Sequence, residues 1–202
     1  MSATINKTLS APLGFITHTL TDVNQQLGRA RPFFTDILKQ GYALYEAEGF
    51  PCSNPRDLPP EEARQEAQEH FDEWFPSAGG FQRNAGYAVR DNDRKLAAFL
   101  FHQAVERLYY WVLLVLVLYS PKSHRLSFLR SQAEQVAPQL VDAWPRDDLF
   151  SRRCFELLRQ AYVNARYWPH YEITDEELAW LANHVAELQA LVEQVCRGRL
   201  AA

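Results

Sequence analysis

DNDRKLAAFLFHQAVERLYYWVLLVLVLY, residues 91–119, is the stretch of sequence that decides the fold. Asp91 or Asp93 can cap the start of a helix, and Pro121 ends it because proline cannot continue a helix. The second half is apolar on nearly every side, which is typical of the central helix of a bundle. Valines between residues 112 and 117 leave a buried strand open as an alternative, but the length of the stretch favours a helix.

Further helices are predicted on both sides of this stretch. Upstream, residues 61–75 follow a Pro-Pro pair that suits a helix start, and Pro76 with Gly79-Gly80 is expected to break this helix before residues 81–89 resume it. Downstream, apolar residues at helical spacing mark an amphipathic helix, namely Leu126, Leu129, Ala133 and Val136.

Two more helices are predicted toward the C-terminus. Residues 149–165 form one, which should end near residues 166–168 because Pro169 disfavours the helical conformation for the residue before it. Thr174 followed by Glu177 fits a capping box at the start of the last helix. Its apolar stripe recurs at gaps of three and four residues, at Leu178, Leu181, Val185, Leu188, Val192 and Val195. The sequence therefore predicts an all-α bundle.

The first sixty residues differ from the rest. Residues 49–60 contain four prolines, which prevent regular structure, and we interpret them as a linker. Residues 14–20 and 42–49 are candidate extended segments on either side of one or two helices. We therefore expect residues 1–60 to form a small α/β or irregular extension and residues 61–202 to form the helical bundle.

Composition limits the classes of function. The net charge is -4, with 21 basic and 25 acidic residues among 202, so any nucleic-acid contact must come from a local patch. The longest uncharged apolar run, residues 108–119, is shorter than the roughly 20 residues that a membrane helix needs. The N-terminus lacks the pattern of a signal peptide. These features predict a cytoplasmic protein that does not enter a membrane.

No metal or cofactor chemistry is predicted. Cys52, Cys154 and Cys196 are far apart and form no Cys-x-x-Cys or Cys/His cluster, which argues against a disulfide framework or a zinc site. None of the six histidines has a glutamate three residues before it, so the di-metal site found in some helical bundles is not expected either.

Residues 71–199, about two thirds of the chain, resemble the HEPN family. The resemblance lies in the order and spacing of AAFLFHQAVERLYYWVL (97–113), YSPKSHRLSFL (119–129), ELLRQAYVNARYWPHYEIT (156–174) and the leucine-striped helix after them. It implies a bundle of about five helices and a homodimer. Residues 23–46 resemble the tail of a nucleotidyltransferase domain, but the Gly-Ser turn and paired aspartates of such a catalytic domain are missing. A nucleotidyltransferase domain or protein is therefore an expected partner.

The resemblance also implies where catalysis would occur. Many HEPN proteins are metal-independent ribonucleases that use an arginine and a histidine, with four to six residues between them, at the dimer cleft. Here Arg166 would bind the phosphate and His170 would act as acid or base, with Asn164 and Tyr171 orienting the substrate. Only histidine titrates near neutral pH unaided, and the arginine fork matches two phosphate oxygens. The spacing is one residue short of the usual minimum, and Pro169 fixes the turn.

A second group of polar residues lies on the central apolar helix. His102 and Glu106 are one turn apart, and they either bind substrate in the same cleft as Arg166 or form a buried hydrogen-bonded network. His124 is interpreted as part of a solvated turn. Tyr109, Tyr110 and Trp111 cannot all enter one core, because successive helical residues point about 100° apart. At least one of them should meet a partner or another segment.

Two functions follow from these observations. The favoured hypothesis is a dimeric helical module that binds RNA or a nucleotide and is associated with a nucleotidyltransferase. The alternative is a toxin-like, metal-independent endoribonuclease that uses Arg166 and His170.

Overall fold

The computed structural model describes residues 16–201. The chain divides into two compact units, one ending at Leu58 and the other beginning at Pro59. In the first unit, α1 (Leu20–Gly28) is capped by Thr19, whose hydroxyl accepts a hydrogen bond from the backbone N–H of Asp22. Helix α2 (Pro32–Gln40) has proline at its first position, where the missing N–H is not needed.

The segment after α2 is irregular and returns to α1 through long-range hydrogen bonds, of which two are the shortest. The side-chain oxygen of Asn24 accepts from the N–H of Ser53 at 2.7 Å, and the carbonyl of Leu27 accepts from the N–H of Arg56 at 3.2 Å. Residues 16–58 contain no strand. The extended segment considered for residues 42–49 is therefore irregular, and the one considered for residues 14–20 lies partly outside the described residues.

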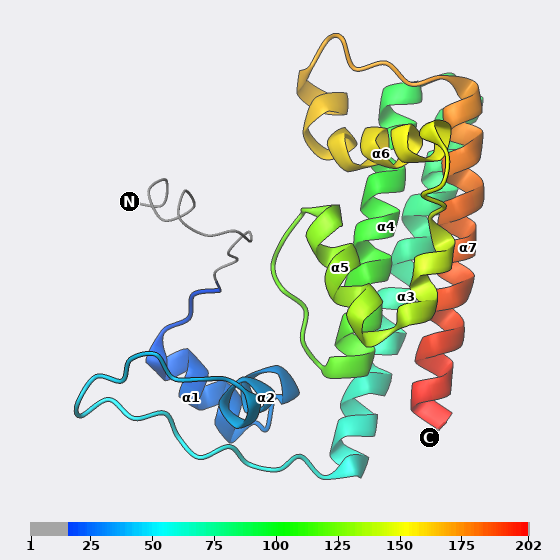
Figure 1. Cartoon of the computed structure of the whole chain (residues 1–202). Coiled ribbons are helices and arrows are strands. Elements are labelled where there is room, and N and C mark those ends of the chain that lie inside the picture. Colours follow the sequence, from blue (N-terminus) through cyan, green and yellow to red (C-terminus); the bar gives the residue numbers. More distant parts are fainter. Residues whose placement is uncertain (1–15, 202) are drawn as a thin grey trace. The chain divides into compact units, whose positions relative to one another are not determined.

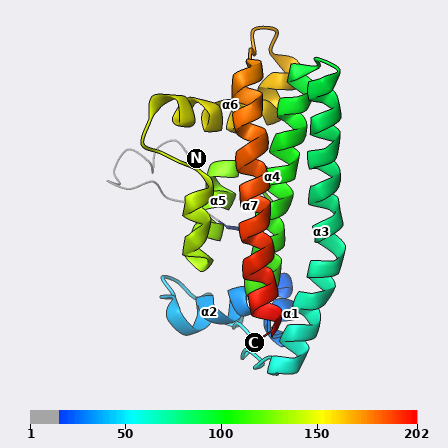
Figure 2. The same ribbon diagram turned by 90° about the vertical axis from the view of Figure 1, so that its right-hand side faces the viewer.

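The second unit is an all-α bundle, which confirms the predicted fold class (Figure 1). Its five α-helices are α3 (Pro60–Arg90), α4 (Arg94–Val117), α5 (Leu126–Val136), α6 (Leu149–Tyr167) and α7 (Asp175–Ala201), with a short 3-10 helix at Pro138–Ala143 between α5 and α6. Helices α3, α4 and α7 run side by side, and α6 lies across α4 and α7 (Figures 1 and 2). Helix α4 packs against all four others and is the centre of the bundle.

Helix α4 begins and ends where the sequence predicts. Of the two candidate caps, Asp93 is the one used, and its carboxylate accepts from the N–H of Leu96 at 3.1 Å. Leu118 ends the helix in a left-handed conformation with φ of 51°. The helix is long and apolar enough to span a membrane, but 61% of its most apolar window is buried inside the protein. That burial is expected of the core helix of a bundle. Because residues 94–117 are helical, the alternative of a buried strand is wrong.

Helix α3 corrects one prediction, because it runs unbroken through Pro76 and Gly79-Gly80. An internal proline costs a helix about 3 kcal/mol. Apolar side chains on both sides of it offset this cost, since burying a phenylalanine contributes about 1.5–3 kcal/mol and burying the methyl group of an alanine about 0.8 kcal/mol. Phe71 lies before the proline and Ala78 and Ala85 lie after it, and all three are buried. Tertiary packing therefore outweighs the local signal for a break.

The aromatic triplet on α4 is accommodated within one chain. Tyr109 and Trp111 are fully buried, and the phenol of Tyr109 accepts a hydrogen bond from the indole N–H of Trp144 at 2.9 Å. Tyr110 points toward another segment, where its hydroxyl donates to the carbonyl of Ser123 at 2.6 Å and accepts from the N–H of Ser123 at 3.1 Å. The triplet thus needs no partner surface.

Helix α7 starts with the predicted capping box. The carboxylate of Glu177 accepts from the N–H of Thr174 at 2.8 Å, and the hydroxyl of Thr174 accepts from the N–H of Glu177 at 3.2 Å. Glu177 is buried and also accepts from Nε of Arg153 on α6 at 2.6 Å. Burial opposes ionisation, but these hydrogen bonds outweigh it and lower the pKa of Glu177.

Replacing Glu177 with alanine is expected to lower the free energy of unfolding by about 1–2 kcal/mol at pH 7, because it removes the cap and the partner of Arg153. A carboxyl whose pKa is lowered on folding stabilises the folded state above its unfolded pKa and loses that contribution as pH falls. The difference should therefore shrink below the ordinary pKa of 4.5. Urea denaturation at pH 7 and pH 4 measures both effects.

Glu176 provides the matched control for this experiment, because it is an exposed glutamate in the same turn. Its replacement with alanine is expected to change stability by less than about 0.5 kcal/mol. Equal effects of the two substitutions at pH 7 would contradict a specific capping role for Glu177.

Candidate functional site

The polar stripe on α4 is buried. His102 and Glu106 are 0% and 2% exposed. Burial, and after it the positive charges of His124 and Arg166, lowers the pKa of His102 to about 3, so its imidazole is neutral at physiological pH. Its Nδ1 lies 3.3 Å from the side-chain amide of Gln103. Its Nε2 is buried without a hydrogen-bond partner.

Glu106 is paired with a histidine from the turn between α4 and α5. Its Oε2 accepts from Nδ1 of His124 at 3.0 Å. The carboxylate side chain is only 3% exposed, whereas the imidazole is 58% exposed. Burial raises the pKa of Glu106, and the hydrogen bond from His124 opposes that rise. A buried carboxylate thus orients an imidazole that faces solvent.

The ring of Tyr162 on α6 connects these groups to Arg166. His124 stacks on it with ring centres 4.6 Å apart and planes 10° apart, and the His102 ring is 5.3 Å away. The guanidinium carbon of Arg166 lies 4.4 Å from the centre of the same ring. We call His102, Glu106, His124, Tyr162 and Arg166 the Tyr162 cluster.

Arg166 is held in place at the end of α6. Its Nε donates to the carbonyl of Tyr162, one turn earlier in the helix, at 2.6 Å. Its guanidinium also lies 5.1 Å from the ring of Phe99 on α4 and 5.0 Å from that of Tyr167. The residue remains exposed, so a planar cation supported by aromatic rings faces solvent.

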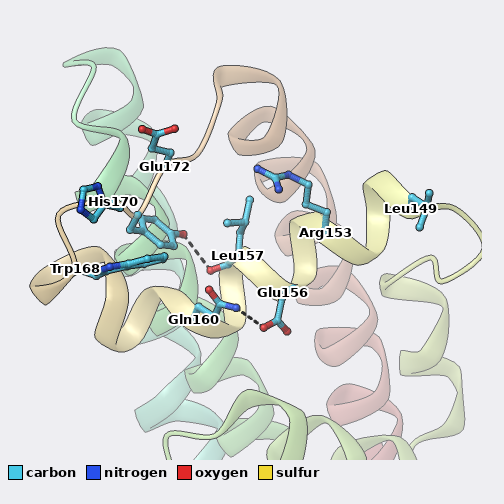
Figure 3. A pocket seen from close by; sticks show the side chains of 9 residues that line it. Leu149, Arg153, Glu156, Leu157, Gln160, Trp168, His170 and Glu172 are labelled. Carbon is cyan, nitrogen blue, oxygen red and sulfur yellow. Dashed lines mark hydrogen bonds between the residues drawn. The ribbon is translucent and has the colours of Figure 1, made fainter.

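His170 belongs to a different hollow. It lies in the turn after α6, is exposed, and lines a space of about 630 Å³ beside α6. Figure 3 shows His170 next to Trp168 at one end of this hollow and Leu149 at the other. Arg166 is not among the residues that line it. The structure therefore places Arg166 and His124 against the same ring, that of Tyr162, while His170 faces a separate space.

The two predicted substrate-orienting residues are engaged in local hydrogen bonds. Asn164 is half-buried, and its side-chain amide donates to the amide oxygen of Gln160 at 3.2 Å. Tyr171 is 1% exposed, and its hydroxyl donates to the carbonyl of Leu157 at 3.0 Å (Figure 3). Both bonds secure the end of α6 and the turn that follows.

Sequence reasoning did not identify His124 and Tyr162 as site residues. Eighteen residues separate His124 from Glu106, so no short motif contains both. One signal was present: the turn of residues 121–125 follows the central helix directly and carries basic side chains next to the polar stripe. Within residues 16–201, no group of three or more His, Cys, Asp or Glu side chains is arranged to hold a metal ion.

The Tyr162 cluster combines three chemical capacities. Its arginine can bind an anion, its exposed imidazole offers a stacking surface, and its carboxylate–imidazole pair has the geometry of an oriented acid or base. Comparison with known families places these residues. Residues 71–195, which are more than half of the chain and include the whole Tyr162 cluster, match the family model of the HEPN domain. No curated protein matches the sequence. The chain belongs to the HEPN family.

Proposed function

We propose that this protein binds RNA or a nucleotide at the Tyr162 cluster. The HEPN domain supports a helical module related to nucleotides or RNA. The observation that carries the proposal is that two exposed groups, Arg166 and His124, lie on one aromatic ring. The chain as a whole is acidic, so a local cationic site of this kind is what nucleic-acid binding requires.

Each group has a distinct part in binding. The guanidinium of Arg166 donates to phosphate oxygens, and its contact with Tyr162 keeps the fork oriented. The exposed His124 ring provides a face on which a base can stack. Lys122 and Arg125, both exposed in the same turn, add positive charge beside it. The proposal includes action in the cytoplasm.

The proposal also includes a homodimer and a nucleotidyltransferase partner. Large apolar side chains are exposed along α6 and at its end, which supports a protein surface there. They are Leu149, Val163, Tyr167 and Trp168, with exposed fractions of 78%, 52%, 72% and 49%. Exposed apolar side chains that lie close together often mark a surface that contacts another protein.

Metal-independent RNA cleavage is the second candidate function, and the Glu106–His124 pair favours it. The imidazole of His124 would accept the proton of a 2′-hydroxyl, and the resulting oxygen would attack the adjacent phosphorus. The 5′-oxygen would leave and take a proton from solvent, which yields a 2′,3′-cyclic phosphate and a 5′-hydroxyl. Arg166 would stabilise the charge that develops on the phosphate. In the other assignment of the catalytic residues, Arg166 binds the phosphate and His170 acts as the acid or base.

Arg166→Ala is expected to weaken binding of single-stranded RNA about tenfold, because it removes a charge-assisted contact to phosphate. It should also reduce the dependence of affinity on salt by about one counterion. Fluorescence anisotropy with a labelled oligoribonucleotide in EDTA measures both quantities. Mononucleotide binding is measured in parallel by calorimetry.

Arg64→Ala is the matched control, because it removes an exposed arginine that is paired with Glu61 at the start of α3. We expect it to leave affinity nearly unchanged. Thermal melting checks that both variants are folded. The proposal fails if the wild type binds neither RNA nor mononucleotide, or if Arg166→Ala and Arg64→Ala have equal effects.

A further inference from the structure

A second cationic site lies away from the Tyr162 cluster, in a hollow between α5 and the start of α6. The hollow has a volume of about 390 Å³. Its polar lining consists of Ser127, Arg130, Ser131, Glu134, Arg146 and Arg152. Three guanidiniums and two hydroxyls therefore converge on a space that contains a single carboxylate.

Positive charge in this hollow exceeds what the carboxylate neutralises. Glu134 accepts from Nε of Arg130 at 2.6 Å and from Nη2 of Arg146 at 2.8 Å through each of its oxygens. The side chain of Arg152 has no ion pair or hydrogen bond with any part of the chain that the structure describes. With three guanidiniums facing one carboxylate, two positive charges remain.

Within the described residues, the neighbouring Asp147 and Asp148 form no ion pair with the three arginines of the hollow. Asp148 caps α6, and its two carboxylate oxygens accept from the N–H and the hydroxyl of Ser151, each at 2.7 Å. Neither Asp147 nor Asp148 lines the hollow. Arg152 lies in the first turn of α6, where the helix dipole opposes a positive side chain. Helix stability therefore does not explain the position of Arg152.

Two of the arginines are rigidly placed. Arg130 is 9% exposed, its guanidinium lies 4.5 Å from the ring of Phe155, and its Nη2 donates to the carbonyl of Trp144 at 3.5 Å. Arg146 is fixed by its two bonds to Glu134 while its side chain stays 53% exposed. Fixed donors bind an anion at a lower entropic cost than mobile ones.

We propose that this hollow binds a terminal phosphate group, either the 5′-phosphate of an RNA or the phosphate of a mononucleotide. A phosphate monoester carries close to two negative charges at neutral pH, which matches the two uncompensated positive charges. Its oxygens accept from the arginine forks and from the serine hydroxyls. An internal phosphodiester carries one charge and matches less well. The proposal concerns a different surface from the Tyr162 cluster and does not depend on it.

The test compares one oligoribonucleotide with and without a 5′-phosphate, and AMP with adenosine. The wild type is expected to bind each phosphorylated ligand about tenfold more tightly, which is the contribution of a strong charge-assisted contact. Arg152→Ala and Arg146→Ala should each remove most of this preference. Arg152→Lys, which keeps the charge but loses the fork, should retain part of it. Arg64→Ala should keep it in full.

The outcomes separate this proposal from the others. Loss of preference for AMP in Arg152→Ala identifies a free nucleotide as a source of the phosphate, and loss restricted to RNA identifies the RNA end. Arg166→Ala should weaken both forms of the RNA equally and leave their ratio unchanged, so failure of the Tyr162 cluster is seen independently. The proposal is overturned if the wild type shows no preference for the phosphorylated ligands or if Arg152→Ala retains it. Urea denaturation verifies that Arg152→Ala is as stable as the wild type.

Discussion

His124→Ala is expected to slow RNA cleavage in EDTA by about a hundredfold or more, because loss of a general acid or base typically has effects of this size. The exposed imidazole of His124 is oriented by buried Glu106 at 3.0 Å and stacks on the Tyr162 ring that Arg166 also contacts. RNA binding should fall by much less, because Arg166 remains. Gel analysis of a labelled RNA, with the 2′,3′-cyclic phosphate identified in the product, measures the rate.

Two further variants show whether the effect belongs to this pair. Glu106→Gln keeps the size of the side chain and removes its charge, and we expect a decrease of about tenfold or more because the imidazole loses its orienting carboxylate. His170→Ala is expected to leave the rate within about threefold, because His170 lines a hollow that does not include Arg166. A large loss in His170→Ala together with a normal rate in His124→Ala would return the assignment to Arg166 and His170. Absence of cleavage by the wild type would leave binding as the function.

Trp111→Ala is expected to lower the free energy of unfolding by about 3–5 kcal/mol, the usual range when a large buried aromatic side chain is truncated. Trp111 is fully buried on α4, with its ring centre 5.0 Å from that of Phe71 and 4.8 Å from that of Phe75 on α3. A domain is stable by only about 5–15 kcal/mol, so this one change removes a large share of the total. Denaturation in urea measures it.

Two tryptophan substitutions provide controls for packing. The indole N–H of Trp111 is buried without a partner, so Trp111→Phe removes an unsatisfied donor while keeping an aromatic ring. We expect it to cost less than half as much as Trp111→Ala. Trp168 is 49% exposed, and its replacement with alanine should cost less than about 1 kcal/mol. Similar losses for Trp111→Ala and Trp168→Ala would contradict the central position assigned to α4.

The parts of the fold that sequence predicts well are those controlled by neighbouring residues. The capping box of Thr174 and Glu177 is complete within four residues, and the structure contains both of its hydrogen bonds. Pro76 is the opposite case, because its local tendency to break a helix is outweighed by packing between α3 and α4. Packing between distant segments leaves no signal near the proline itself.

The same distinction explains the site. Arg166 and His170 are four residues apart, but the helix end and the turn direct their side chains to different surroundings. The groups that do meet come from α4, from the turn after it and from α6, so their proximity depends on how three segments pack. Residue types alone indicated Glu106 as notable, whereas the basic turn of residues 121–125 was only a weak signal, and the pairing of His124 with Glu106 follows from the fold.

The two hydrogen bonds between the hydroxyl of Tyr110 and the backbone of Ser123 have a consequence for ligand binding. It makes the backbone next to His124 a rigid extension of the core helix, so the imidazole retains only the rotations of its own side chain. Little conformational entropy is then lost when a ligand immobilises the ring. We therefore expect a ligand to bind to a preformed surface, without a large rearrangement of the loop.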